Sequence, residues 1–163
     1  MSPLKLTWIV AIFALALDQA TKVGVVWGLD LITVRYIEVI PPYLVFVMGW
    51  NTGINFGLFG GSGEFGRWFL VVIAVGVSVL LSNWVRKATG WLSPTAFGLI
   101  IGGALGNALD RVMYGAVADF LNMSCCGFQN PYTFNVADIF IFAGVFAVII
   151  QSFAEEWEAK KSQ

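Results

Sequence analysis

Long apolar segments, separated by short groups of charged residues, dominate this chain. No charged residue occurs at 68–85, 88–109 or 139–154, and the segment 6–28 carries only two. A helix needs about 20 mainly apolar residues to cross the hydrocarbon core of a bilayer. The pattern therefore predicts an all-α membrane protein with four transmembrane helices, at about 6–27, 67–85, 94–114 and 136–155.

Two longer connections, 28–66 and 115–134, join the predicted helices. The first contains the runs LITVRYIEVI and YLVFVMGWN, which are rich in β-branched and aromatic residues and lie on either side of Pro41-Pro42. Such runs around a turn predict a small extracytoplasmic β element between the first and second helices. Because the sequence has no internal repeat, we interpret residues 1–163 as one integral membrane domain.

The distribution of positive charge indicates how the helices are oriented. Five positive residues lie at helix ends on one predicted side of the membrane: Lys5, Arg86, Lys87, Lys160 and Lys161. Only Arg35 and Arg67 lie on the other side. Positive residues concentrate on the cytoplasmic side, so both termini are expected there and both long connections outside. A cleaved signal peptide is an alternative for the first segment, because Ala14-Leu15-Ala16 imitates a cleavage site. The apolar run that resumes after Lys22 favours a membrane helix.

Composition excludes several classes of protein. The mean hydropathy is +0.80, with 58% hydrophobic and 12% charged residues, whereas an average soluble domain carries about 25% charged residues. A net charge of −1 without a basic tract gives no electrostatic basis for nucleic-acid binding. The absence of histidine removes histidine-based catalysis and most zinc sites. The adjacent Cys125 and Cys126 cannot supply a metal site alone, so no metal or cofactor is expected.

Four acids are predicted near the outer ends of the helices: Asp18, Asp110, Asp119 and Asp138. Charged groups at membrane depth face the protein interior and usually carry function. Two neighbouring carboxylates cannot both ionise, so they share one proton. The ionised partner can then activate a water molecule for attack on a carbonyl, while the protonated partner polarises that carbonyl and later protonates the leaving amine.

The neighbours of these acids indicate which two form the pair. Asp18 precedes Lys22 by four residues on one helix face, and Asp110 is followed by Arg111, so each has a cation that can neutralise it. Asp119 and Asp138 have no Lys or Arg between them. They are therefore the candidate catalytic pair, with helix capping or simple solvation as the structural alternative. A Ser–Lys pair built on Lys22 would need Ser78 or Ser82, which are predicted in the inner half of the membrane.

Five sequence blocks resemble the lipoprotein signal peptidases (signal peptidase II), which are bacterial intramembrane aspartic peptidases. The blocks are DQATK at 18–22, NTGINFGLF at 51–59, GGALGNALDR at 102–111, GAVADF at 115–120 and FNVADIFI at 134–141. The resemblance implies that Asp119 and Asp138 are the catalytic dyad. It further implies that four polar residues bind the substrate: Asn51, Asn107, Arg111 and Asn135. Three charged residues would support the site structurally: Asp18, Lys22 and Asp110.

Some residues are ambiguous. Asn55 and Ala118 depart from the family pattern, which usually has a small residue and Val at these places. Gly102, Gly103 and Gly106 are interpreted as positions of close helix packing rather than ligand contacts. Cys125-Cys126 is interpreted as a loop pair without a catalytic role, with a vicinal disulfide as the alternative.

The resemblance implies an aspartic endopeptidase that removes signal peptides from diacylglyceryl-modified prolipoproteins by cutting before the lipidated cysteine. Its partners would be that substrate and membrane lipids, with no nucleic acid and no obligate protein partner. The expected location is the bacterial inner membrane, with the active site on the periplasmic side. A small proton-coupled transporter and a non-catalytic membrane assembly factor are the alternatives, because membrane acids also serve as proton relays.

Overall fold

In a computed structural model, residues 1–53, 63–127 and 129–161 are described. Their elements are, in order, α1 (Pro3–Lys22), η1 (Val23–Gly28), α2 (Leu31–Val34), β1 (Tyr36–Ile40), β2 (Leu44–Asn51), α3 (Gly63–Trp84), η2 (Val85–Lys87), α4 (Leu92–Tyr114), β3 (Val117–Met123) and α5 (Val136–Lys161). Four helical segments are long and apolar enough to span a membrane: Pro3–Gly28, Gly63–Lys87, Leu92–Tyr114 and Val136–Glu158. The expected fold class, four membrane helices with a small sheet, is confirmed.

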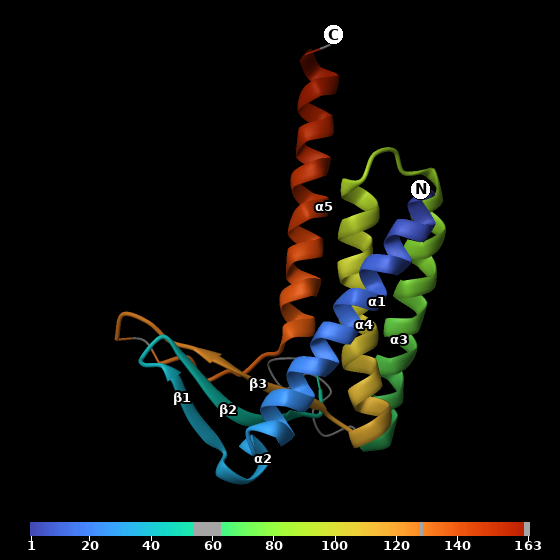
Figure 1. Ribbon diagram of the computed structural model, residues 1–163. Helices are drawn as coiled ribbons and strands as arrows, with labels where there is room; N and C mark the ends of the chain where they lie inside the picture. Colours follow the sequence, from blue (N-terminus) through green and yellow to red (C-terminus); the bar gives the residue numbers. More distant parts are fainter. Residues whose placement is uncertain (54–62, 128, 162–163) are drawn as a thin grey trace.

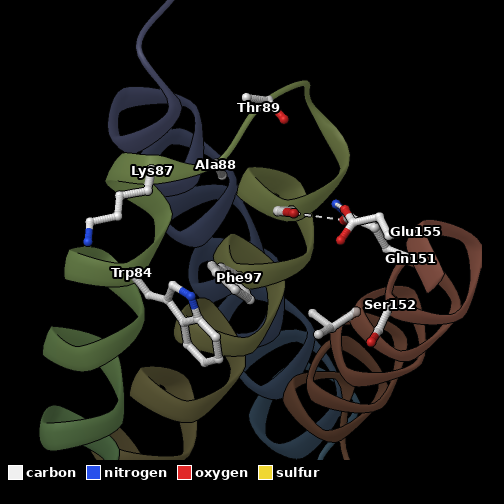
Figure 2. A pocket seen from close by; sticks show the side chains of 10 residues that line it. Trp84, Lys87, Ala88, Thr89, Phe97, Gln151, Ser152 and Glu155 are labelled. Carbon is white, nitrogen blue, oxygen red and sulfur yellow. Dashed lines mark hydrogen bonds between the residues drawn. The ribbon is translucent and has the colours of Figure 1, made fainter. Parts of the chain in front are cut away.

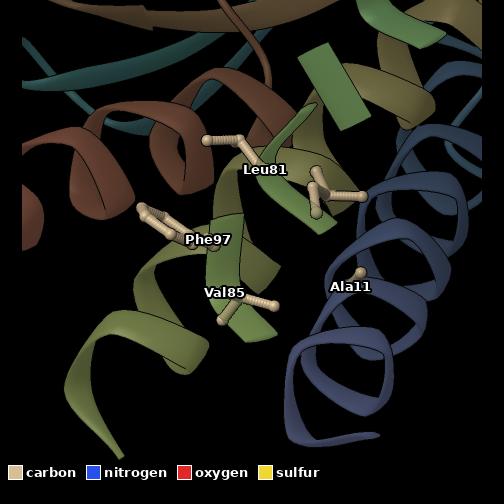
Figure 3. Close-up of a cluster of buried hydrophobic side chains, with 5 residues drawn as sticks. Ala11, Leu81, Val85 and Phe97 are labelled. Atoms are coloured by element: carbon tan, nitrogen blue, oxygen red, sulfur yellow. The ribbon is translucent and has the colours of Figure 1, made fainter. Parts of the chain in front are cut away.

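Both termini and the connection between α3 and α4 lie at one end of the bundle, and the sheet lies at the other (Figure 1). The helix α4 is the centre of the bundle, because α1, α3 and α5 all pack against it. Ala11, Leu81, Val85, Phe97 and Ile101 form a buried cluster in the half of the bundle remote from the sheet (Figure 3). This cluster joins α1, α3 and η2 to α4.

The sheet is antiparallel, in the order β1-β2-β3. Its third strand comes from the segment 115–134, which the sequence pattern predicts only as an outer connection between helices. Residue Gly115 ends α4 with a φ of 80°, a left-handed conformation that glycine adopts readily, and so turns the chain directly into β3. Because β3 pairs with β2 along its length, a segment that contains Asp119 is part of the sheet.

The run LITVRYIEVI is only partly a strand, which corrects the expectation of a β segment along its whole length. Leu31–Val34 forms one helical turn, bounded by Asp30 and Arg35 in left-handed conformations, and the strand begins at Tyr36. Leu31 is fully buried in a cluster with Val26 and Met48. Burial of this side chain outweighs the weak β preference of its neighbours.

Candidate active site

The two acids Asp119 and Asp138 reach one site from two different elements. Asp119 lies in the middle of β3 and is 2% exposed. Asp138 lies in the first turn of α5 and is half-buried. Both line a cavity of about 340 Å³ at the sheet end of the bundle. The structure therefore brings together the two acids that the sequence analysis selected.

Asn135 connects the two carboxylates. Its side-chain amide donates to Asp119 Oδ1 at 2.6 Å, and its backbone N–H donates to Asp138 Oδ2 at 3.2 Å. Its side-chain oxygen accepts from the Asp138 backbone N–H at 3.0 Å. This reciprocal pair of bonds is a capping box at the start of α5. Asp138 thus does cap its helix, as the structural alternative held, but only one of its carboxylate oxygens is used for this purpose.

Two further asparagines hold the remaining carboxylate oxygens. Asn51, at the end of β2, donates to Asp119 Oδ2 at 3.0 Å, and Asn107, in α4, donates to Asp138 Oδ1 at 2.9 Å. The neutral amides of Asn51, Asn107 and Asn135 therefore satisfy all four carboxylate oxygens without neutralising them. Charge neutralisation by an adjacent cation would instead favour two ionised carboxylates over a shared proton.

Asp18, Lys22 and Asp110 form a buried ionic cluster beside the dyad. Lys22 Nζ lies 2.8 Å from Asp18 Oδ2 and 2.8 Å from Asp110 Oδ2, and all three side chains are at most 2% exposed. The pairing of Asp18 with Lys22 was expected. The pairing expected between Asp110 and Arg111 is wrong, because Lys22 neutralises Asp110 from another helix and Arg111 donates to backbone carbonyls.

Each acid of this ionic cluster holds the backbone next to one acid of the dyad. Asp110 Oδ2 accepts the N–H of Ala118 at 3.1 Å, immediately before Asp119. Asp18 Oδ1 accepts the N–H of Ala137 at 2.9 Å, immediately before Asp138. The cluster therefore fixes the positions of β3 and of the first turn of α5 relative to α1 and α4.

Lys22 also orients one of the amides at the dyad. Its ammonium donates to Asn107 Oδ1 at 3.3 Å, which turns the amide nitrogen of Asn107 toward Asp138. Gln19 adds donors to Asp18 Oδ2 at 3.1 Å and to Asp110 Oδ1 at 2.9 Å. Sequence reasoning missed Gln19, although it lies within the DQATK block. Its proximity to Asp18 was visible, but its contact with a helix 91 residues away was not.

Arg111 lies at the rim of the cavity. Its guanidinium donates to Gly53 O at 2.9 Å and to Asn107 O at 3.3 Å. Its Nε is buried and has no hydrogen-bond partner among the described residues. A buried donor without a partner costs free energy, so Arg111 Nε is a candidate to donate to a bound substrate.

Electrostatics at Asp119 favour a shared proton. Burial, and then the negative charge of Asp138, raise the pKa of Asp119 from 3.8 to about 7. The hydrogen bonds from Asn51 and Asn135 oppose this shift, because they stabilise the ionised carboxylate. Asp119 is therefore about half protonated at pH 7 and mostly protonated at lower pH.

Apolar side chains of three helices form the rest of the cavity wall. They are Leu70, Ile73, Ala74 and Val77 of α3, Ile100 and Ala104 of α4, and Ile141 of α5. The polar groups gather at one end of this cavity, around the dyad. Such a cavity suits a substrate that presents a peptide bond next to a long apolar segment.

Glycines in α4 allow the helices to approach the site closely. A Cβ on Gly106 would lie 2.7 Å from Asp18 Oδ2, and one on Gly102 or Gly103 would overlap the backbone of α1 or α5. The interpretation of these glycines as packing positions is thus confirmed.

The departures from the family pattern have different outcomes. Ala118 is fully buried and contributes its backbone N–H to the site. Asn55 lies outside the described residues.

The exposed Cys125 and Cys126 form a vicinal disulfide near the far end of β3.

These features define, in a bundle of helices long enough to span a membrane, a site in which two carboxylates are held by amides at the end of an apolar cavity. The family described as signal peptidase (SPase) II matches residues 10–154. The lipoprotein signal peptidase of Methylobacterium radiotolerans is 42% identical over 96% of this chain and 90% of that protein. That of Methylorubrum extorquens is 46% identical over 85% of this chain and 80% of that protein. The chain belongs to the signal peptidase II family.

Two solved structures share this fold. A structure described as a bacterial membrane enzyme superimposes with a TM-score of 0.77 and 29% identity, covering 92% of this chain and 88% of that one. A second structure of the same description gives a TM-score of 0.73 and 28% identity, covering 89% of this chain and 90% of that one. Nothing in these comparisons supports the transporter alternative.

Proposed function

We propose that this protein is an aspartic endopeptidase that removes signal peptides from diacylglyceryl-modified prolipoproteins, with Asp119 and Asp138 as the catalytic pair. Family membership supports the peptidase activity and the prolipoprotein substrate. The observation that carries the aspartic mechanism is the pair of carboxylates, Asp119 buried and Asp138 half-buried, that Asn135 bridges and that neutral amides hold within the described part of the chain.

The reaction begins with a water molecule between the two carboxylates. Ionised Asp138 takes a proton from this water while the water oxygen attacks the carbonyl carbon of the scissile peptide bond. In its protonated form, which a pKa of about 7 keeps populated near neutral pH, Asp119 donates a hydrogen bond to the carbonyl oxygen and stabilises the negative charge that develops there. Collapse of the tetrahedral intermediate breaks the C–N bond, and the leaving amine takes a proton from the dyad.

Arg111 and the asparagines position the substrate in this scheme. Arg111 Nε, which is buried in the cavity wall, donates to a carbonyl of the substrate backbone. Asn51 and Asn107 keep the carboxylates in place. Both amides line the cavity, where they can also form a hydrogen bond with the bound peptide. Asp18, Lys22 and Asp110 act through the backbone and are positioning residues.

Topology determines which substrates reach the dyad. By the distribution of Lys and Arg, the bundle end with both termini faces the cytoplasm, and the sheet with the dyad faces the periplasm of a bacterial inner membrane. A prolipoprotein is held in the same membrane by its signal helix and its acyl chains. This anchoring keeps the scissile bond near the depth of the dyad, which lowers the entropic cost of productive binding.

The test replaces each acid by its isosteric amide. Asp119→Asn and Asp138→Asn should each lower kcat for a lipidated precursor at least about 100-fold, because the dyad loses its acid or its base. Asp30→Asn is the matched control: Asp30 is exposed at the same end of the bundle and has a φ of 55°, which asparagine tolerates well. Normal precursor processing by both variants in proteoliposomes would refute the assignment of Asp119 and Asp138 as the catalytic pair. Ion flux across the membrane of these proteoliposomes, carried by the protein, would favour the transporter alternative instead.

A further inference from the structure

We call the face of α4 between α3 and α5 the groove, because it carries a hollow near each end. Both of these helices pack extensively on α4, but they make few contacts with each other in the described part of the chain. Figure 1 shows α4 between them. The cavity at the dyad occupies one end of this groove.

A second hollow, of about 410 Å³, lies at the opposite end of the same groove (Figure 2). The residues that line the two hollows follow one face of each helix. In α4 the series runs from Arg111 and Asn107 through Ala104 and Ile100 to Phe97 and Ser93, and in α5 it runs from Asp138 and Ile141 to Val148 and Glu155. Spacings of three and four residues keep such positions on one side of a helix. The two hollows therefore lie on the same side of α4 and on the same side of α5.

The far hollow carries an acidic group at its edge. Ser93 Oγ donates to Gln151 Oε1 at 2.7 Å, and Gln151 Nε2 donates to Glu155 Oε1 at 2.7 Å. This chain of bonds fixes the carboxylate at the mouth of the hollow. Lys87 lies on the opposite edge, beyond Trp84, with its ammonium directed away from Glu155 (Figure 2). A cation on the Glu155 side of the hollow is therefore separated from the positive charge of Lys87.

The distance between the two ends matches the length of a signal peptide. Glu155 lies seventeen positions after Asp138 in α5, which is about 25 Å at about 1.5 Å per residue. A signal peptide has a basic segment, then roughly 7–15 apolar residues, then a short cleavage region. Lying in the groove as a helix with its cleavage site at the dyad, such a peptide places its basic segment beside Glu155.

We propose that the hollow at Trp84, Ser93 and Glu155 is a subsite for the positively charged N-terminal segment of the signal peptide, with Glu155 as its specificity-determining residue. The inference rests on the proposed function, because it assumes that a signal helix lies in the groove. Glu155 accepts a hydrogen bond from a Lys or Arg of the substrate, and the faces of Trp84 and Phe97 pack against the aliphatic part of that side chain. Substrate specificity then depends on the length of the apolar segment as well as on the sequence around the cleavage site.

The experiment compares two lipidated precursor peptides in liposomes of neutral lipid, one with lysines in its N-terminal segment and one with glutamines there. Glu155→Gln should raise KM for the basic peptide about two- to fivefold, the range expected for an exposed ion pair, and leave kcat unchanged. It should not change KM for the glutamine peptide. Glu156→Gln is the matched control, because Glu156 is the adjacent acid and pairs with Lys160 outside the hollow.

A third peptide tests the length argument. Four additional apolar residues move the basic segment about 6 Å further along the groove, so the difference in KM between wild type and Glu155→Gln should disappear. Equal KM values for wild type and Glu155→Gln on the basic peptide would overturn the proposal. A fall in kcat on both shorter peptides would indicate a structural role instead and would also overturn it.

Two other outcomes are distinguishable. If Lys87→Gln raises KM for both peptides in liposomes with anionic lipid while Glu155→Gln has no effect, the hollow binds a lipid headgroup and the proposal is wrong. If the wild-type protein cuts neither peptide, the proposed function itself fails. Cleavage of both peptides without any effect of Glu155 contradicts the subsite alone.

Discussion

Removal of the Lys22 ammonium is the most informative single perturbation of this structure. In Lys22→Met a side chain of similar length loses its charge, while Asp18 and Asp110 remain buried. Both carboxylates lie 2.8 Å from the ammonium, and none of the three side chains is more than 2% exposed. Breaking a buried ion pair by removing one partner costs about 3–5 kcal/mol. Because one cation serves two carboxylates here, we expect the free energy of unfolding to fall by at least about 3 kcal/mol.

The same substitution should impair catalysis through two sets of contacts. Asp18 and Asp110 hold the backbone N–H groups of Ala137 and Ala118, next to the dyad. When these carboxylates repel each other, both anchors loosen. Asn107 also loses the donor that orients its amide. We therefore expect kcat to fall even under conditions in which the variant remains folded.

Equilibrium unfolding in detergent micelles measures the effect. Lys160→Met is the matched control, since Lys160 pairs with Glu156 in an exposed salt bridge, with side chains 72% and 60% exposed. That variant should lie within about 0.5 kcal/mol of the wild type. The triple variant Asp18→Asn, Lys22→Met, Asp110→Asn should recover part of the loss, because no uncompensated charge remains. A Lys22→Met variant as stable as the Lys160→Met control would refute the reasoning.

Two further predictions concern the site. The folded-state pKa of Asp119 is about 7 against 3.8 for an ordinary Asp, so the folded protein binds the proton more tightly. The free energy of unfolding should therefore decrease from about pH 4 to about pH 7, by at most about 4 kcal/mol. For the same reason kcat/KM should fall above about pH 7. If the free energy of unfolding of Asp119→Asn decreases with pH as steeply as that of the wild type, the prediction is wrong. Gly106→Ala places a Cβ 2.7 Å from Asp18 Oδ2 and should lower the free energy of unfolding by about 1–3 kcal/mol, as measured by thermal unfolding. Gly76→Ala is the control: nothing lies within 4 Å of its new Cβ, so this variant should be as stable as the wild type or more stable.

The sequence alone determined the class of fold and predicted which acids form the candidate catalytic pair. Four apolar segments of about membrane-spanning length, three of them without a charged residue, leave little choice of architecture, because backbone polar groups in lipid must be satisfied within a helix or a closed barrel. The absence of histidine left paired acids as the simplest hydrolytic chemistry. The i,i+4 spacing of Asp18 and Lys22 also predicted an ion pair that the structure contains. These features are local, or depend on composition, and a single sequence carries them directly.

Tertiary structure decided which groups hold the acids in place. The partner of Asp110 is Lys22, 88 residues earlier in the chain and on another helix, rather than the adjacent Arg111. The strand β3 exists because β2 supplies its hydrogen-bond partners, so the segment around Asp119 gave no sufficient signal by itself. The groove that joins the dyad to Glu155 likewise depends on how three helices pack together. Contacts between distant segments follow from packing geometry, and the local periodicity of one chain does not encode them.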